Sequence, residues 1–88
     1  MLRPSEHVIF TDLDGVEGVL VDLNTKRYYQ LNETASLIWR GLANGTPVEE
    51  IAGEMTRVYD VAPEHARASV DAAVARFSAY QLLSTTAG

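Results

Sequence analysis

The chain has 88 residues, 47% of them apolar, so it is long enough for one small domain and too hydrophobic to be disordered. It contains no cysteine, which excludes disulfides and thiolate metal ligands and fits a reducing compartment. Its formal net charge is −5 and its basic residues are scattered, which argues against nucleic acid as a partner.

We expect a single domain over residues 1–88, with an ordered core from about 6 to 83. No stretch approaches the roughly 20 apolar residues that cross a bilayer. The first six residues also lack the apolar segment of a signal peptide. These features predict a soluble cytoplasmic protein without a membrane partner.

The first third of the chain predicts three strands joined by short turns. His7–Leu13 is rich in β-branched and aromatic residues and ends at an Asp14-Gly15 turn. Val16–Leu23 alternates along its length, and the polar break Asn24-Thr25-Lys26 separates it from Arg27–Leu31. We therefore expect a three-stranded antiparallel meander with one face packed on the rest of the domain.

The remainder predicts three helices. Asn32 is a good N-cap for a first helix that ends at Asn44-Gly45, where glycine can adopt the left-handed conformation. The string Thr46-Pro47-Val48-Glu49 predicts a capping box that starts a second helix. We expect the third helix from Pro63 to about Gln81, and a frayed tail over Ser84–Gly88.

Apolar residues recur at helical spacing in each of the three helices, and these stripes define the expected core. The stripes are Ala35, Ile38, Trp39 and Leu42; then Val48, Ile51, Ala52, Met55 and Tyr59; then Ala66, Val70, Val74, Phe77 and Gln81. Strands followed by helices indicate the α+β fold class.

Side chains capable of chemistry do not form a catalytic pattern. His7 and His65 lie far apart, without metal-ligand spacing. Asp12, Asp14 and Glu17 surround the first turn, where a solvated turn explains them better than acid–base catalysis. We therefore expect a non-catalytic binding protein with no metal and no cofactor.

The predicted third strand offers a place for a partner. If Arg27–Leu31 lies at the edge of the sheet, its unpaired backbone groups can accept a further strand. Its alternation places Tyr28 and Gln30 on one face and Tyr29 and Leu31 on the other, where the latter two fit the core. The third helix could wall a groove beside this edge through Val70, Asp71, Val74 and Phe77, although the three apolar ones also fit the core.

A family resemblance lies in five segments of the chain, Gly18–Leu23, Arg27–Ala35, Ile38-Trp39, Gly45–Ile51 and Val58-Tyr59. These segments resemble the PqqD-like family, the precursor-peptide recognition elements of ribosomally synthesised and modified peptides. The Tyr-x-Leu-Asn-x-Thr-Ala string followed by Ile-Trp is fairly specific, and the resemblance covers roughly residues 6–83. It implies a winged-helix-like fold with a three-stranded sheet and three helices.

The resemblance also implies a binding mode, in which the precursor's leader peptide adds antiparallel to the third strand and lies against the third helix. Carried to this sequence, it places leader contacts at Arg27, Tyr28, Tyr29, Gln30 and Leu31, and at Arg67, Val70, Asp71, Val74 and Phe77. The strand positions match the family's pattern directly, whereas those on the helix depend on a register inferred from periodicity.

Within the family, the Arg-Tyr-Tyr-Gln-Leu-Asn run is most similar to the stand-alone recognition proteins of lasso-peptide clusters. That similarity implies a leader with a Tyr-x-x-Pro element, whose tyrosine would enter an apolar pocket beside the third helix. It also implies a separate transglutaminase-like leader peptidase, and the macrocyclase, as partners. The alternatives are a quinone-cofactor (PQQ-type) peptide chaperone, a small winged-helix DNA-binding regulator and a purely structural subunit.

Overall fold

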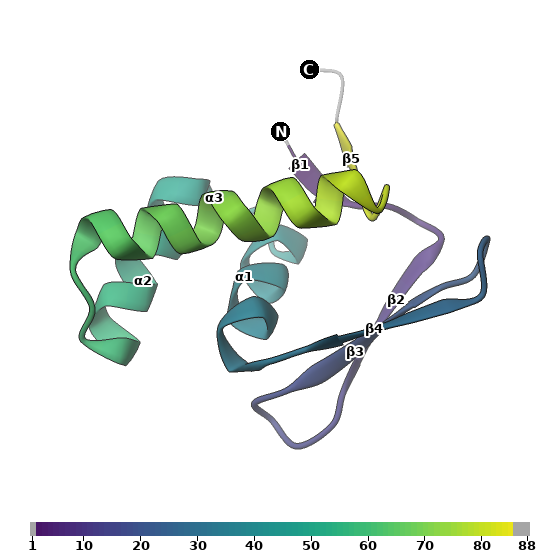
Figure 1. Ribbon diagram of the computed structural model, residues 1–88, viewed down its shortest axis with the longest axis horizontal. Helices are drawn as coiled ribbons and strands as arrows, with labels where there is room; N and C mark the ends of the chain where they lie inside the picture. The colour runs from purple at the N-terminus through teal and green to yellow at the C-terminus, as the bar shows by residue number, and fades with distance from the viewer. Residues whose placement is uncertain (1, 86–88) are drawn as a thin grey trace.

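The computed structural model describes residues 2–85 and shows an α+β domain in which a strand meander precedes three helices (Figure 1). The elements are β1 (Leu2–Pro4), β2 (Val8–Asp12), β3 (Gly18–Asp22), β4 (Arg27–Leu31), α1 (Glu33–Ala43), α2 (Val48–Tyr59), α3 (Pro63–Ala79) and β5 (Leu83–Thr85). The fold class and the order of the three central strands and three helices are as the sequence predicted.

The central sheet is an antiparallel meander in the order β2-β3-β4. Phe10, Leu20 and Tyr29 lie opposite one another across the three strands. The β3–β4 turn depends on Asp22, whose buried carboxylate accepts the N–H groups of Asn24 and Thr25 at 2.9 and 3.2 Å. The Asp22 side chain thus satisfies two backbone N–H groups of the turn, which lie outside the strand pairing.

A second, two-stranded sheet joins the ends of the chain, and the sequence analysis missed it. β1 pairs antiparallel with β5, with Arg3 opposite Ser84 (Figure 1). The expected frayed tail is therefore wrong for Ser84 and Thr85, while residues 86–88 lie outside the described part. The buried side chain of Leu82 helps to position β5, because it packs in the core directly before that strand.

The helix boundaries follow local capping signals with two corrections. The side chain of Asn32 accepts the Ala35 N–H at 2.9 Å and caps α1 as predicted. The capping box before α2 is wrong, because Pro47 occupies the N-cap position and makes no side-chain cap. α3 ends at Ala79, two residues before the predicted end, because Gln81 turns into the left-handed region with φ 59°.

The core lies between the inner face of the meander and the three helices, and it contains most of the predicted stripes. Its buried apolar members are Leu20, Leu31, Ile38, Trp39, Leu42, Ile51, Ala52, Met55, Ala66, Val70, Ala73, Phe77 and Leu82. Trp39 and Phe77 meet edge to face with ring centroids 5.2 Å apart. Gln81 is exposed, so its place in the third stripe was wrong.

Helices α1 and α2 pack closely at Gly41. A Cβ atom at this glycine would lie 2.7 Å from Cγ1 of Ile51, a contact that forces a neighbour to move. Gly41 thus allows the close approach of the two helices. Among residues 2–85, no helix is long and apolar enough to cross a membrane.

Candidate functional site

The open edge of β4 is the first element of the site. Within the described residues β4 pairs with β3 alone, so its outer edge carries no strand there. The backbone of Glu17 and that of Leu23, which flank β3, hydrogen-bond to the β2 side. Because successive residues of a strand bond to opposite neighbours, the residues of β3 at even positions, 18, 20 and 22, bond to β4.

This alternation decides which backbone groups of β4 are free. Residues 18, 20 and 22 lie opposite Leu31, Tyr29 and Arg27, so these three residues of β4 use their backbone groups within the sheet. The N–H and C=O groups of Tyr28 and Gln30 consequently point away from the sheet. They are available to another strand, as edge-strand groups generally are.

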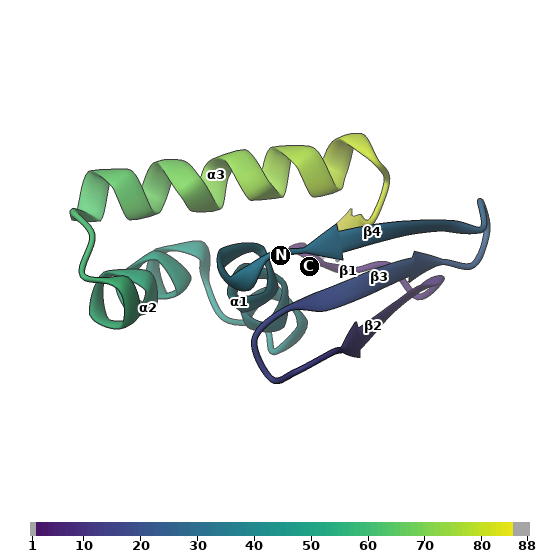
Figure 2. The same cartoon turned by 60° about the horizontal axis from the view of Figure 1, so that its bottom comes forward.

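Helix α3 lies beside this edge. In Figure 2, β4 is the strand of the meander nearest to α3, and β3 and β2 follow at increasing distance. The ring of Tyr29 on β4 stacks against that of Tyr80, the C-cap residue of α3, with centroids 4.9 Å apart. This contact holds the end of α3 next to the middle of the edge strand.

Two adjoining hollows separate β4 and the start of α1 from α3. The first, of about 290 Å³, is lined by Glu17, Gln30, Asn32, Ala35 and Arg76. The second, of about 210 Å³, is lined by Asn32, Thr34, Ala35, Ile38, Ser69, Ala72, Ala73 and Arg76. Asn32, Ala35 and Arg76 line both, so the hollows are adjacent, and together they are called the β4–α3 groove below.

The structure brings the predicted strand residues to this groove in different ways. The side chain of Tyr28 is 74% exposed, and those of Arg27 and Gln30 are also exposed. Tyr29 is half-buried against Tyr80, and Leu31 is only 4% exposed and belongs to the core. The backbone and side chain of both Tyr28 and Gln30 are therefore accessible to a partner, whereas the side chain of Leu31 packs in the core and anchors the strand.

The residues of α3 that the sequence analysis expected to contact the leader do not line the two hollows. Val70 and Phe77 are buried in the core, and Val74 is half-buried against it. Arg67 contacts Asp71 at 3.0 Å and, across to α2, Glu49 at 3.4 Å. The carboxylate of Asp71 raises the pKa of the Arg67 guanidinium. Arg67 and Asp71 thus lie on the flank of α3 that faces α2.

The flank of α3 that faces the groove carries Ser69, Ala72, Ala73 and Arg76, which the sequence analysis missed. Their spacing of three, one and three residues is helical, but they are small or charged and do not form an apolar stripe. A signal existed in the alanines at positions 72, 73 and 75, although it does not reveal which neighbour the flank faces.

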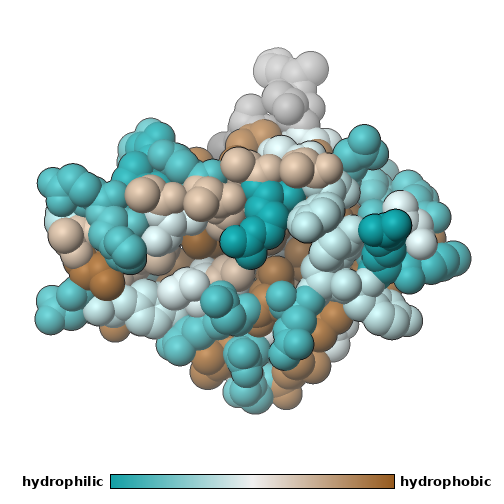
Figure 3. All heavy atoms as spheres, in the orientation of Figure 1, coloured by the Kyte–Doolittle hydropathy of each residue, from teal (hydrophilic) through white to brown (hydrophobic). Residues whose placement is uncertain are grey.

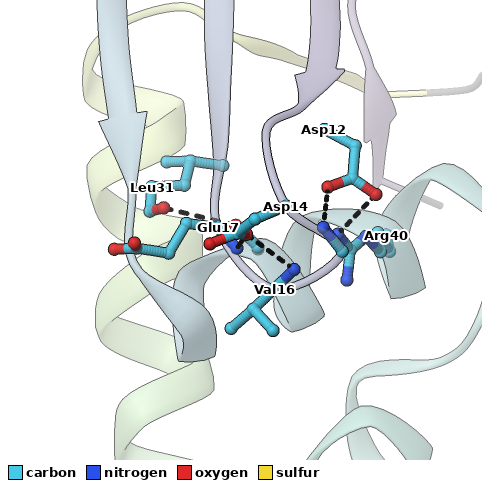
Figure 4. A network of polar contacts seen from close by, with 8 residues as sticks. Asp12, Asp14, Val16, Glu17, Leu31 and Arg40 are labelled. Atoms are coloured by element: carbon cyan, nitrogen blue, oxygen red, sulfur yellow. Dashed lines mark hydrogen bonds and ion pairs between the residues drawn. The ribbon is translucent and has the colours of Figure 1, made fainter.

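The β2–β3 turn shapes the end of the groove near Glu17. Asp14 Oδ1 accepts the N–H groups of Glu17 at 2.7 Å and Val16 at 2.9 Å, and these bonds hold the pKa of Asp14 below its usual value (Figure 4). Asp12 contacts the Arg40 guanidinium on α1 at 3.4 Å. These carboxylates are thus used to order the turn and fasten it to α1, which favours the structural interpretation of the acidic cluster.

A further hollow of about 320 Å³ lies between this turn, α1 and α2. It includes Arg40, Glu33, Glu54 and the phenol of Tyr59. Burial, together with a hydrogen bond to Glu33, raises the pKa of Tyr59. Among residues 2–85, no group of three or more His, Cys, Asp or Glu side chains could hold a metal ion.

The solvent face of the meander carries exposed apolar side chains. Ile9, Val21 and Tyr28 lie opposite one another across the three strands, and Ile9 is 48% exposed. Leu13 and Val16 are exposed at the β2–β3 turn, where Figure 3 shows apolar atoms at the lower edge of the molecule. An exposed patch of this kind marks a candidate protein-binding surface.

The molecule is thus a small winged-helix-like domain with an open sheet edge beside its last helix. Residues 17–83 match the family described as coenzyme PQQ synthesis protein D (PqqD). The match extends over more than half of the chain, and the chain belongs to the PqqD family, as its resemblance predicted. No curated protein matches the sequence significantly.

Two solved structures are closely similar over the whole fold. The first is TbiB1 in complex with the TbiA(beta) leader peptide, with a TM-score of 0.88 and 27% identity over 98% of this chain and 99% of that chain. The second is a lasso peptide synthetase B1 complexed with the leader peptide, with a TM-score of 0.87 and 26% identity over 96% and 98% of the two chains.

Proposed function

We propose that this chain is a non-catalytic module that binds the leader peptide of a ribosomally made precursor and presents it to a leader peptidase in lasso-peptide maturation. The leader adds to β4 as an antiparallel strand and lies in the β4–α3 groove. The observation that carries the proposal is the outward-facing backbone of Tyr28 and Gln30 beside that groove. Two chains of the same fold are known with leader peptides.

Backbone pairing supplies the sequence-independent part of the affinity in this binding mode, and side-chain pockets supply the specificity. Arg27, Tyr28 and Gln30 contact the leader directly. Tyr29 and Leu31 act mainly through packing, because their side chains point to the inner face of the sheet.

On the helix, the geometry leads us to redraw the expected contacts. Val70 and Phe77 lie on the buried face of α3, and Val74 packs beside them. Arg67 and Asp71 pair on the other flank and receive no direct leader contact in this proposal. The contacts pass instead to the residues of α3 that line the groove, which are Ser69, Ala72, Ala73 and Arg76.

The second hollow of the groove suits an anchor of the leader that is both apolar and polar. Ile38 and the small side chains Ala35, Ala72 and Ala73 form the apolar part of its lining, and the polar part consists of Asn32, Thr34, Ser69 and Arg76. A tyrosine fits such a site well, since its ring buries apolar area while its hydroxyl can reach a polar neighbour. We assign this hollow to the tyrosine of a Tyr-x-x-Pro leader.

Presentation to the peptidase requires a second surface, and the apolar face of the meander provides one. It adjoins β4, so the peptidase could dock there while the leader occupies the edge. Tethering the precursor in this way raises its effective concentration at the peptidase. Replacing Ile9 with Glu should abolish stimulation of the peptidase while leader affinity is retained. Loss of both, or of neither, would contradict docking of the peptidase on this face.

The leader-binding proposal is tested by fluorescence anisotropy with labelled leaders of precursor-like reading frames that neighbour this gene. Saturable binding is expected, and it should weaken when the leader tyrosine or proline is replaced. The matched variants are Ser69→Phe, which fills the groove, and Ser78→Phe, which lies half a helical circumference away on α3. Only the first should lose binding; equal affinities in two folded variants would contradict the groove assignment.

The family match to PQQ synthesis protein D favours one alternative, a peptide chaperone for quinone-cofactor biosynthesis. That role would use the same β4 edge, with a different precursor. The two functions are separated by the leader that binds, so a panel containing both kinds of precursor decides between them.

A further inference from the structure

The first hollow of the groove is polar and carries both signs of charge. Glu17 lies directly before β3 and Arg76 lies in the last turn of α3, and the side-chain amides of Gln30 and Asn32 line the same hollow. Its remaining lining residue is Ala35. The adjoining hollow differs in that its lining contains no acidic residue and includes Ile38 and three alanines.

The backbone at each of the two charged residues is ordered by hydrogen bonds, and the two side chains do not pair with each other. The backbone of Glu17 is bonded to Asp14, and Arg76 sits in regular helix, where its carbonyl accepts the Tyr80 N–H. Within residues 2–85, neither Glu17 nor Arg76 forms a salt bridge. Glu17 is also half-buried, which weakens solvent screening of its charge. An acceptor and a donor therefore remain available to a bound side chain.

We propose that this hollow is a specificity subsite that selects an uncharged polar side chain of the leader, an amide or a hydroxyl, and discriminates against both signs of charge. The inference rests on the proposed leader binding. An amide can donate to the Glu17 carboxylate and accept from the Arg76 guanidinium at the same time. A carboxylate would be attracted by Arg76 and repelled by Glu17, and an ammonium group would meet the reverse.

Two single substitutions should switch the preference in opposite directions. Glu17→Gln removes the repulsion of acids, so it should make the subsite prefer a leader glutamate. Arg76→Gln should make it prefer a leader lysine. Each switch should change the ratio of affinities by about fivefold, which is the upper range for partly exposed charge pairs.

The measurement is anisotropy with a leader series in which each position is in turn Gln, Glu or Lys. The wild-type protein should prefer Gln at one position, and the two variants should shift that same position to Glu and to Lys. Glu49→Gln on α2 and Arg67→Gln on α3 are matched controls, because they remove the same two kinds of charge from the contact between α2 and α3, away from the groove.

The possible results separate the subsite from the function. If leaders bind but Glu17→Gln and Arg76→Gln leave the order of Gln, Glu and Lys unchanged, the subsite is refuted while leader binding stands. The subsite is likewise refuted if the control variants shift the preference equally. If no leader binds the folded wild-type protein, leader recognition itself is overturned and the subsite with it.

Discussion

The ring of Tyr29 in the edge strand lies 4.9 Å from the ring of Tyr80 at the end of α3, and the two planes are inclined by 35°. The pair joins the two walls of the β4–α3 groove at one end. Tyr80 nevertheless remains 46% exposed, so its ring also offers surface to anything that pairs with β4.

Replacing Tyr80 with Ala should therefore weaken leader binding by about two- to tenfold, since an aromatic pair contributes about 0.5–1.5 kcal/mol beyond its buried area. Tyr80→Phe keeps the ring and should bind nearly as the wild type does. Anisotropy gives the affinities, and circular dichroism shows whether the variants are folded. A folded Tyr80→Ala protein with unchanged affinity would exclude Tyr80 from the groove.

Amide hydrogen exchange should reveal the open edge directly. In the free protein the N–H groups of Tyr28 and Gln30 should exchange fast, whereas those of Arg27, Tyr29 and Leu31 should be protected by β3. Leader binding should protect the first two and leave the others little changed. Residue-resolved NMR exchange checks this, and slow exchange of Tyr28 and Gln30 without leader would show that the edge is already covered.

Proline substitution should separate leader pairing from sheet stability. Gln30→Pro removes an outward N–H that the sheet does not use, so the fold should survive while leader binding falls at least tenfold. Tyr29→Pro removes an N–H that bonds to β3 and should unfold the sheet. Thermal melting and anisotropy distinguish the two. Gln30→Ala controls for the side chain, and a Gln30→Pro protein that binds normally would rule out strand addition at this residue.

Phe77 should matter for stability before it matters for binding. Its buried ring packs edge-on against Trp39, so Phe77→Ala should lower the free energy of unfolding by about 3–5 kcal/mol. Urea denaturation followed by the fluorescence of the single tryptophan measures this loss. A loss below about 1 kcal/mol would contradict core packing of the ring.

The β3–β4 turn should make stability depend on pH through Asp22. Burial raises the pKa of this carboxyl, but the N–H bonds from Thr25 and Asn24 and the nearby His7 outweigh burial and lower it from the ordinary 3.8. The stabilisation is therefore complete above the unfolded pKa and disappears as pH falls through the lower, folded pKa.

Replacing Asp22 with Asn keeps the shape and removes the charge. The variant should melt below the wild type at pH 7, and the difference should shrink as the pH falls through the lowered pKa of the wild-type carboxyl. Thermal unfolding at several pH values provides the measurement. If the difference in melting temperature stays constant from pH 7 to pH 2, the charge of Asp22 does not contribute to stability.

Some features of this protein follow from the sequence alone because their causes are local. The bounds of Arg27–Leu31 and the Asn32 cap depend on alternation and on hydrogen bonds between residues three apart, and the structure agrees with both. The buried stripe from Ala66 to Phe77 is equally a matter of helical spacing. The strand half of the candidate site could therefore be located before any coordinates were known.

Tertiary structure alone decided the rest. The two flanks of α3 are both polar or small, so spacing does not show that Arg76 faces β4 and Arg67 faces α2; that depends on how the whole helix packs. The pairing of Arg3 with Ser84 joins opposite ends of the chain, which no local pattern can anticipate. The groove and its two charges arise from this packing, because Glu17 and Arg76 meet the same hollow only after the sheet and helices have assembled.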